Sequence, residues 1–122
     1  MSHVSPETDT GALQTSQPTS LKDLLKTVDG AVVSRTLLRR STGNITLFSF
    51  DRGQGLSEHT APFDAFVLVL DGQVLLTIGG NKLEAKAGDA VVMPAHVPHA
   101  LEATAPLKML LVMIREPSAA AG

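Results

Sequence analysis

The chain has 122 residues, of which 43% are hydrophobic, and its net charge is −2 at pH 7 with histidine neutral. This length allows one domain with a packed core and leaves little room for a second. The basic residues are scattered and there is no Trp or Tyr. A basic stripe and aromatic platforms are therefore both missing, and we expect no nucleic-acid partner.

The chain contains no cysteine, which excludes disulfides, thiolate nucleophiles, zinc fingers and iron–sulfur clusters. No apolar run approaches the roughly 18 residues of a membrane-spanning helix. The N-terminus lacks the basic-then-apolar order of a signal peptide. We therefore expect a soluble, cytoplasmic protein that does not interact with membranes.

Composition divides the chain into three parts. Residues 1–19 are rich in Ser, Thr, Pro and Gln and predict a flexible N-terminal tail, in which His3 is solvated. Residues 20–115 carry the apolar patterning of a folded domain. Residues 116–122 form a second tail of Pro, Ser, Ala and Gly.

The domain is predicted to begin with a short helix. Ser20 is the expected N-cap, Asp23 follows at the third helical position, and Asp29-Gly30 closes the element. An apolar stripe formed by Leu21, Leu24, Leu25 and Val28 would dock on the main body, because so short a helix is marginal alone.

From Ala31 onward the apolar residues recur with a period of two, which predicts about eight short strands separated by glycine turns. The absence of crossover helices excludes a parallel α/β fold, so we expect an all-β sandwich or small barrel. The expected strands are Val32–Leu38, Ile45–Phe50, Phe66–Leu70, Val74–Ile78, Lys82–Lys86, Ala90–Met93, Ala100–Ala103 and Met109–Ile114.

The stretch from Gly88 to His99 is the most informative part of the sequence. It begins with a turn pair, continues through four apolar residues and reaches Pro94, which cannot donate to a sheet ladder. Pro98 then stiffens the chain directly before His99. A histidine in this setting has a tightly defined position.

Residues 40–114, with core motifs in 53–103, resemble the cupin family of small RmlC-like jelly-roll barrels. The second cupin motif has Gly, five residues, Pro, one residue, Gly, two residues and His. Gly88, Pro94 and His99 keep this spacing, and His96 stands where the family has the second Gly. The resemblance implies an all-β, double-stranded β-helix barrel behind the short N-terminal helix.

The first cupin motif is only partly kept. Counting back from Gly72, its Glu position falls on Ala65 and its two His positions fall on His59 and Ala61. Cupins typically bind a metal through three His and one Glu, and the resemblance places His59 and His99 opposite each other in the pocket.

Two residues are candidates for a third ligand. His96 lies in a turn, and a set of His59, His96 and His99 with water would suit Zn, Ni or Cu. Asp64 would give the two-histidine, one-carboxylate set that suits Fe(II), or Mn, because Pro62 interrupts the strand before it. Glu58 is excluded by the alternation of side chains. Without a metal, the two histidines would bond to each other, to backbone or to water.

The resemblance implies a small cupin whose apolar pocket binds a small molecule, with a divalent metal at an incomplete site. The alternative is a metal-dependent enzyme, dioxygenase-like or isomerase-like, acting on a small apolar substrate. Whether the chain is an enzyme stays open here, and no catalytic residue is predicted. The four Phe residues with Met93, Met109 and Met113 are expected to form core and pocket wall. We also expect a homodimer, because the apolar 31–38 strand and the helix before it need a partner surface.

Overall fold

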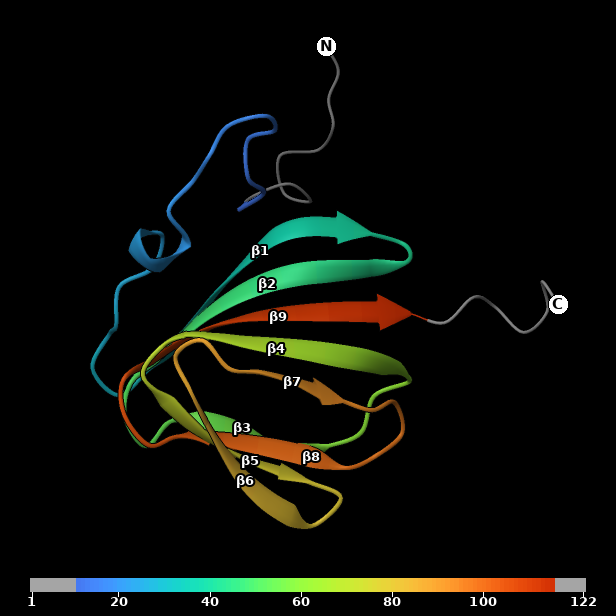
Figure 1. Cartoon of the computed structure of the whole chain (residues 1–122). Helices are drawn as coiled ribbons and strands as arrows, with labels where there is room; N and C mark the ends of the chain where they lie inside the picture. The colour runs from blue at the N-terminus through green and yellow to red at the C-terminus, as the bar shows by residue number, and fades with distance from the viewer. Residues whose placement is uncertain (1–10, 116–122) are drawn as a thin grey trace, which may run out of the picture.

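A computed structural model describes residues 11–115, which form two antiparallel β-sheets packed face to face (Figure 1). The five-stranded sheet has the order β1-β2-β9-β4-β7, and the four-stranded sheet has the order β3-β8-β5-β6. The strands are β1 (Val32–Arg40), β2 (Gly43–Phe50), β3 (Gly55–His59), β4 (Phe63–Asp71), β5 (Gln73–Ile78), β6 (Asn81–Lys86), β7 (Ala90–Met93), β8 (His99–Ala103) and β9 (Leu107–Arg115). The predicted jelly-roll barrel is confirmed.

The core lies between the two sheets because alternate side chains of each strand point inward. In β4, the inward positions Ala65, Val67 and Val69 are at most 3% exposed, whereas their neighbours are less buried. The other large, fully buried members of this core are Phe50, Val74, Leu76, Leu107 and Met109. These side chains close most of the barrel and leave one end less tightly filled.

The predicted N-terminal helix is wrong in extent. Only a single 3-10 turn, η1 (Leu21–Asp23), forms, and the Ser20 side chain makes no capping bond. A helix this short gains too few hydrogen bonds to offset its nucleation cost. Val28, expected in the buried stripe, is instead 50% exposed.

The N-terminal segment, defined here as residues 11–30, instead lies along the five-stranded sheet. The Leu13 amide donates to the Leu37 carbonyl at 3.0 Å. The Lys108 ammonium donates to the Lys22 carbonyl at 2.6 Å. These bonds tie residues 11–22 to β1 and β9. Part of the predicted tail thus contacts the domain, while residues 1–10 and 116–122 lie outside the described residues.

Strand β3 was not among the eight predicted strands, and residues 11–115 contain nine strands. Its side chains are mostly exposed, so it lacks the alternation that identifies a half-buried strand. It forms because it pairs with β8, and the register places His59 directly opposite His99. Within residues 11–115, no helix is long and apolar enough to cross a membrane.

The turn between β4 and β5 depends on a glycine. Gly72 has φ +87°, and a Cβ atom at this position would overlap the backbone carbonyl of Pro106. Gly80 has a similar φ of +83° but no atom within 4 Å of a Cβ. Substitutions at these two positions therefore distinguish the effect of backbone strain, present at both, from the effect of steric overlap, present only at Gly72.

We expect Gly80→Ala to lower the free energy of unfolding by about 1–2 kcal/mol, the usual cost of a left-handed residue. Gly72→Ala should cost about 1–3 kcal/mol more, because the Pro106 backbone must also move. Urea unfolding followed by circular dichroism measures both. Equal losses for the two variants would show that the Pro106 segment yields freely.

Candidate functional site

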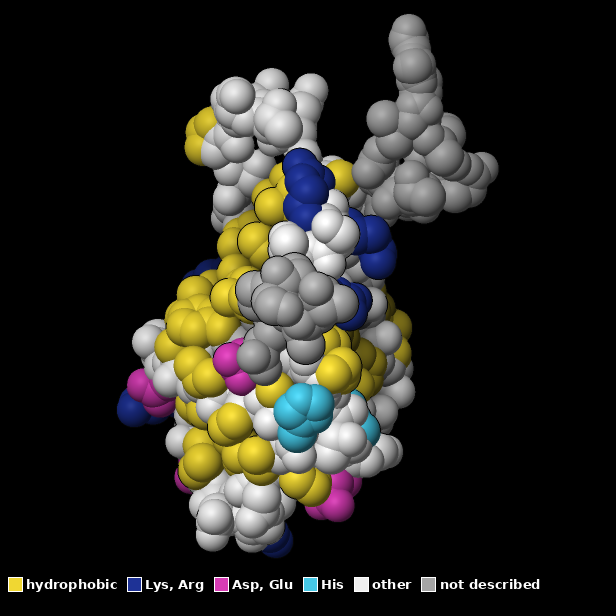
Figure 2. Space-filling model, turned by 90° about the vertical axis from the view of Figure 1, so that its right-hand side faces the viewer, with side chains coloured by type: hydrophobic (Ala, Val, Ile, Leu, Met, Phe, Trp, Pro, Cys, Tyr) yellow, Lys and Arg dark blue, Asp and Glu magenta, His cyan; other side chains and the backbone are white. Residues whose placement is uncertain are grey.

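A cavity of about 310 Å³ opens at the end of the barrel where β4 begins and β9 ends. Figure 2 shows this end of the molecule, where histidine side chains reach the surface among hydrophobic ones. Most of the lining is apolar. The lining residues are Leu56, His59, Thr60, Ala61, Pro62, Phe63, Ala65, Met93, His99, Ala100, Leu101, Leu111 and Met113.

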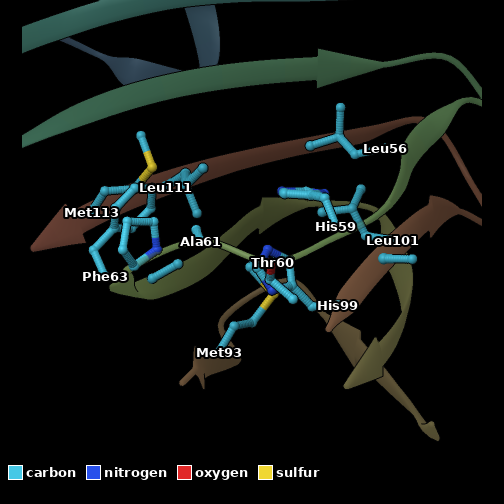
Figure 3. Close-up of a pocket in the computed structure, with 13 residues that line it drawn as sticks. Leu56, His59, Thr60, Ala61, Phe63, Met93, His99, Leu101, Leu111 and Met113 are labelled. Atoms are coloured by element: carbon cyan, nitrogen blue, oxygen red, sulfur yellow. The ribbon is translucent and has the colours of Figure 1, made fainter. Parts of the chain in front are cut away.

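His59 and His99 both line this cavity, as predicted, but they lie side by side on the neighbouring strands β3 and β8 and not across the pocket from each other (Figure 3). They are directly opposed across β3 and β8, their ring centres are 4.4 Å apart, and their planes are inclined by 66°. His99 is only 5% exposed, while His59 is exposed at the mouth. The pair places two imidazole rings in edge-to-face contact at the cavity wall.

Each ring is oriented by a backbone carbonyl two residues before it in the chain. Nδ1 of His59 bonds the Ser57 carbonyl at 2.7 Å, and Nδ1 of His99 bonds the Val97 carbonyl at 3.1 Å. Because a carbonyl oxygen only accepts hydrogen bonds, Nδ1 of each ring must carry the proton. In the neutral rings, Nε2 is therefore left as an acceptor or a metal ligand.

Ala61 and Ala65 stand where the first motif of the family has its other ligands. Both are buried and both line the cavity, at 9% and 3% exposure. The alternation that places them on the face of His59 is therefore correct, although Ala61 itself lies between β3 and β4. Two methyl groups thus replace two polar ligands and make the cavity more apolar.

His96 does not line the cavity. It is exposed in the turn between β7 and β8, and its backbone amide donates to the Ala61 carbonyl at 2.8 Å. Its φ of +67° is a left-handed conformation that favours glycine, the residue the family has here.

Asp64 also lies outside the cavity lining. It is exposed, and its Oδ1 accepts a bond of 2.9 Å from the Ala95 amide. This bond and the one from His96 to Ala61 hold the β7–β8 turn against the start of β4. Among residues 11–115, no group of three His, Cys, Asp or Glu side chains is placed to hold a metal ion.

The aromatic and methionine residues divide into three groups. Phe63, Met93 and Met113 line the cavity, while Phe48, Phe50 and Met109 belong to the core. Phe66 was expected to join them, but it lies on the opposite face of its sheet and is 38% exposed. The guanidinium of Arg115 lies 5.6 Å from the Phe63 ring centre and holds a positive charge near the mouth.

Sequence reasoning did not identify Thr60, Leu56, Leu101 or Leu111 as cavity residues. Leu101 follows His99 by two positions in β8, so alternation alone could have placed it on the same face. Leu111 faces inward with Met109 and Met113 in β9 by the same rule. Thr60 lies in an irregular segment, where no periodicity applies.

The conformation of His96 can be tested by two substitutions. We expect the His96→Gly variant to have a free energy of unfolding about 1 kcal/mol higher than the His96→Ala variant. The reason is that alanine, like histidine, is strained at a positive φ, whereas glycine is not. Both variants keep the backbone bond to Ala61, so chemical denaturation compares the strain alone. Equal stabilities would contradict a left-handed residue in this turn.

Comparison with known proteins agrees with this geometry. The family model described as "Cupin domain" matches residues 46–113. A conserved protein of unknown function from Streptococcus pyogenes is 32% identical, with a TM-score of 0.83, over 97% of this chain and 98% of its own. A cupin superfamily protein from Desulfitobacterium hafniense is 28% identical, with a TM-score of 0.80, over 87% of this chain and 96% of its own.

KdgF from a Halomonas species is 25% identical, with a TM-score of 0.64, over 73% of this chain and 84% of its own. No curated protein matches the chain. The matched family model spans both strands that carry the histidine pair, and the Streptococcus structure extends the likeness over nearly the whole chain. The chain belongs to the cupin family.

Proposed function

We propose that this cupin binds a small, mostly apolar molecule in the barrel cavity, and that His59 and His99 hold its polar group. One observation carries the proposal: a mostly apolar cavity contains two adjacent imidazoles whose Nδ1 atoms are already bonded to backbone carbonyls. Apolar pockets with a few placed polar groups are typical of small-molecule sites.

The cavity volume limits the size of the ligand. About 310 Å³ lies at the lower end of the range of about 300–1,000 Å³ found for ligand pockets. The small side chains of Ala61 and Ala65 contribute to this space, and Leu101, Leu111 and Met113 give it an aliphatic wall. A ligand with a single ring or a short branched chain would fit this shape.

The chemistry of the pair selects the polar group of the ligand. With both Nδ1 atoms donating to backbone, each neutral Nε2 accepts a hydrogen bond. A ligand with a hydroxyl or amide N–H donor would satisfy these acceptors, whereas a ligand with acceptors only would leave them unpaired. We therefore propose an alcohol, a phenol or a similar donor as the ligand class.

The ligand class can be tested with phenol and toluene, which have nearly the same shape and differ in one donor. Both should shift the NMR signals of cavity residues such as Leu101 and Met113. The double variant His59→Ala/His99→Ala should weaken phenol binding by about 3–10-fold relative to toluene, the worth of one net hydrogen bond. Isothermal titration or NMR titration gives the affinities.

Glu58→Ala is the matched control, because Glu58 neighbours His59 in β3 but does not line the cavity. It should leave both affinities unchanged. The double variant should keep its fold, since the histidines contribute little to the core. If neither probe perturbs the cavity signals, or if the loss of both histidines affects the two probes equally, the proposal fails.

A metal-dependent function is the second candidate, and the free Nε2 atoms favour it. Neutral imidazoles with Nδ1 bonded to a carbonyl are arranged as metal-ligating histidines usually are, and imidazole suits Zn, Cu, Ni and Fe. Stable sites have three or four protein ligands, and the described residues bring together only two. The donor set therefore fits an ion that takes its other ligands from water or from the bound molecule.

A metal held in this way would act as a Lewis acid and polarise an oxygen atom of the bound molecule. This is chemistry that a metal-dependent enzyme could use on a small apolar substrate. The side chains of this chain would orient the substrate and exclude water around it. Asp64 is engaged with the Ala95 amide and is not available to the cavity in this conformation.

Elemental analysis of untagged protein, purified without a chelator, tests the second candidate. A stoichiometric metal that is lost in His59→Ala/His99→Ala and kept in His96→Ala would support a site built on the pair. Loss of the metal in His96→Ala would instead show that the β7–β8 turn moves to supply a third ligand. Metal-free protein that takes up no added Zn, Ni or Cu would exclude this candidate.

A further inference from the structure

Arg115 extends one wall of the cavity beyond its apolar part. It is the last residue of β9, and by alternation it shares the inner face of that strand with Leu111 and Met113, which both line the cavity. Its register partner in β4 is Phe63, another lining residue. The Arg115 side chain therefore stands at the mouth of the cavity, directly beyond Met113.

An aromatic ring holds the guanidinium of Arg115 in place. The guanidinium lies 5.6 Å from the Phe63 ring centre, within the distance of a cation–π contact. An arginine can stack on an aromatic ring through its flat face while the N–H groups at its edge stay available. The contact with Phe63 thus positions the charge at the mouth without neutralising it.

No acidic side chain of residues 11–115 forms an ion pair with Arg115. Within that range the only ion pair joins Lys86 and Asp89. Asp64 lies on the outer face of β4, where it accepts a bond from a backbone amide. Glu58 of β3 is exposed and does not line the cavity. The described part of the chain therefore supplies a fixed cation at the mouth without supplying its anion.

A second arginine lies on the same face of the sheet. The register line of Met113 continues through Asn44 in β2 to Arg39 in β1. Since neighbouring strands are about 4.8 Å apart, the Cα atom of Arg39 is about 10 Å from that of Met113. Figure 2 shows basic side chains on this part of the end of the barrel, above the histidines. At this distance Arg39 contributes to the positive potential at the mouth, which attracts anions.

We propose that the ligand of the cavity is a small organic acid, and that its carboxylate binds Arg115 at the mouth. This inference rests on the proposed function, in which His59 and His99 hold a donor group of the ligand. The guanidinium fork matches a carboxylate and forms two parallel bonds with it. A phosphate monoester would bring nearly two negative charges against one contacting arginine.

The positions of the charged and neutral groups define the class of acid further. The histidine pair belongs to the four-stranded sheet and Arg115 to the five-stranded sheet, so the two lie on different walls of the barrel. One ligand that engages both must carry its donor and its carboxylate at opposite ends. The class is therefore a hydroxy acid in which a ring or a short apolar chain separates the hydroxyl from the carboxylate.

The compounds para-hydroxyphenylacetate and para-hydroxyphenylacetamide test this proposal, because they share their shape and phenol donor and differ in charge. In mildly alkaline, low-salt buffer, where histidine side chains are ordinarily neutral, the protein should bind the acid about 3–10-fold more tightly than the amide. The preference should decrease as salt is added, because the pair lies near the surface. Isothermal titration or NMR titration gives both affinities.

Three variants assign the preference to its residue. Arg115→Gln should remove the preference for the acid and leave the affinity for the amide unchanged. Arg115→Lys should restore part of the preference, because lysine keeps the charge and lacks the fork. Arg52→Gln is the matched control, since Arg52 follows β2 at the opposite end of the barrel, and it should behave as the wild type. Circular dichroism confirms that each variant is folded.

The outcomes distinguish this inference from the function on which it rests. Equal affinities of the wild type for the two probes would overturn the acid and leave the neutral donor ligand standing. A preference for the acid that survives in Arg115→Gln would show that another group, such as the histidine pair, holds the carboxylate, and would overturn the role of Arg115. If neither probe binds, the inference and the proposed function both fail.

Discussion

The pairing of β4 with β9 is the constraint on which the rest of the structure depends. These two strands lie side by side at the centre of the five-stranded sheet, and both are apolar on both faces. Their inward-facing residues, including Val67 and Met109, form much of the core. At the cavity end of the barrel, the inward-facing Ala65 of β4 and Met113 of β9 line the cavity. One ladder therefore determines both how the barrel is filled and where it stays open.

The same pairing explains why the outer face of the five-stranded sheet has a covered part and an exposed part. When a strand pair is apolar on both sides, exposing its whole outer face to water is unfavourable in free energy. The N-terminal segment lies along one part of this face, where Leu47 is completely buried, whereas Val92, Phe66 and Leu38 elsewhere on the face are exposed. The cavity lies on the inner face of this sheet and the exposed apolar residues lie on its outer face, so substitutions on one face need not disturb the other.

Much of the fold could be predicted from the sequence because its signals are local. Glycine turns and alternating apolar residues gave the strand order along the chain, and the Gly88–His99 spacing indicated the family. The predicted N-terminal helix was wrong in extent because a propensity pattern does not report the nucleation cost, and Leu21, Leu24 and Leu25 are half-buried without a helix. Strand β3 was missed because its pairing with β8, and not its own pattern, defines it.

The candidate site was only partly predictable, for a similar reason. The resemblance to the cupin motifs placed His59 and His99 in one pocket, and the register of β3 with β8 sets the two residues side by side. The positions of His96 and Asp64 depend on backbone bonds to Ala61 and Ala95, which belong to other parts of the chain. Spacing and parity contain no information about such bonds, so the role of the turn required the structure.

The bonds from the two histidines to carbonyls two residues before them have a consequence for how such a site can change. Each ring is oriented by the backbone directly before it, so its tautomer does not depend on which residues occupy positions 61 and 65. Substitutions at those two positions can add or remove polar ligands while the pair keeps its acceptors. A barrel of this kind can therefore pass between metal binding and ligand binding without rebuilding its histidine pair.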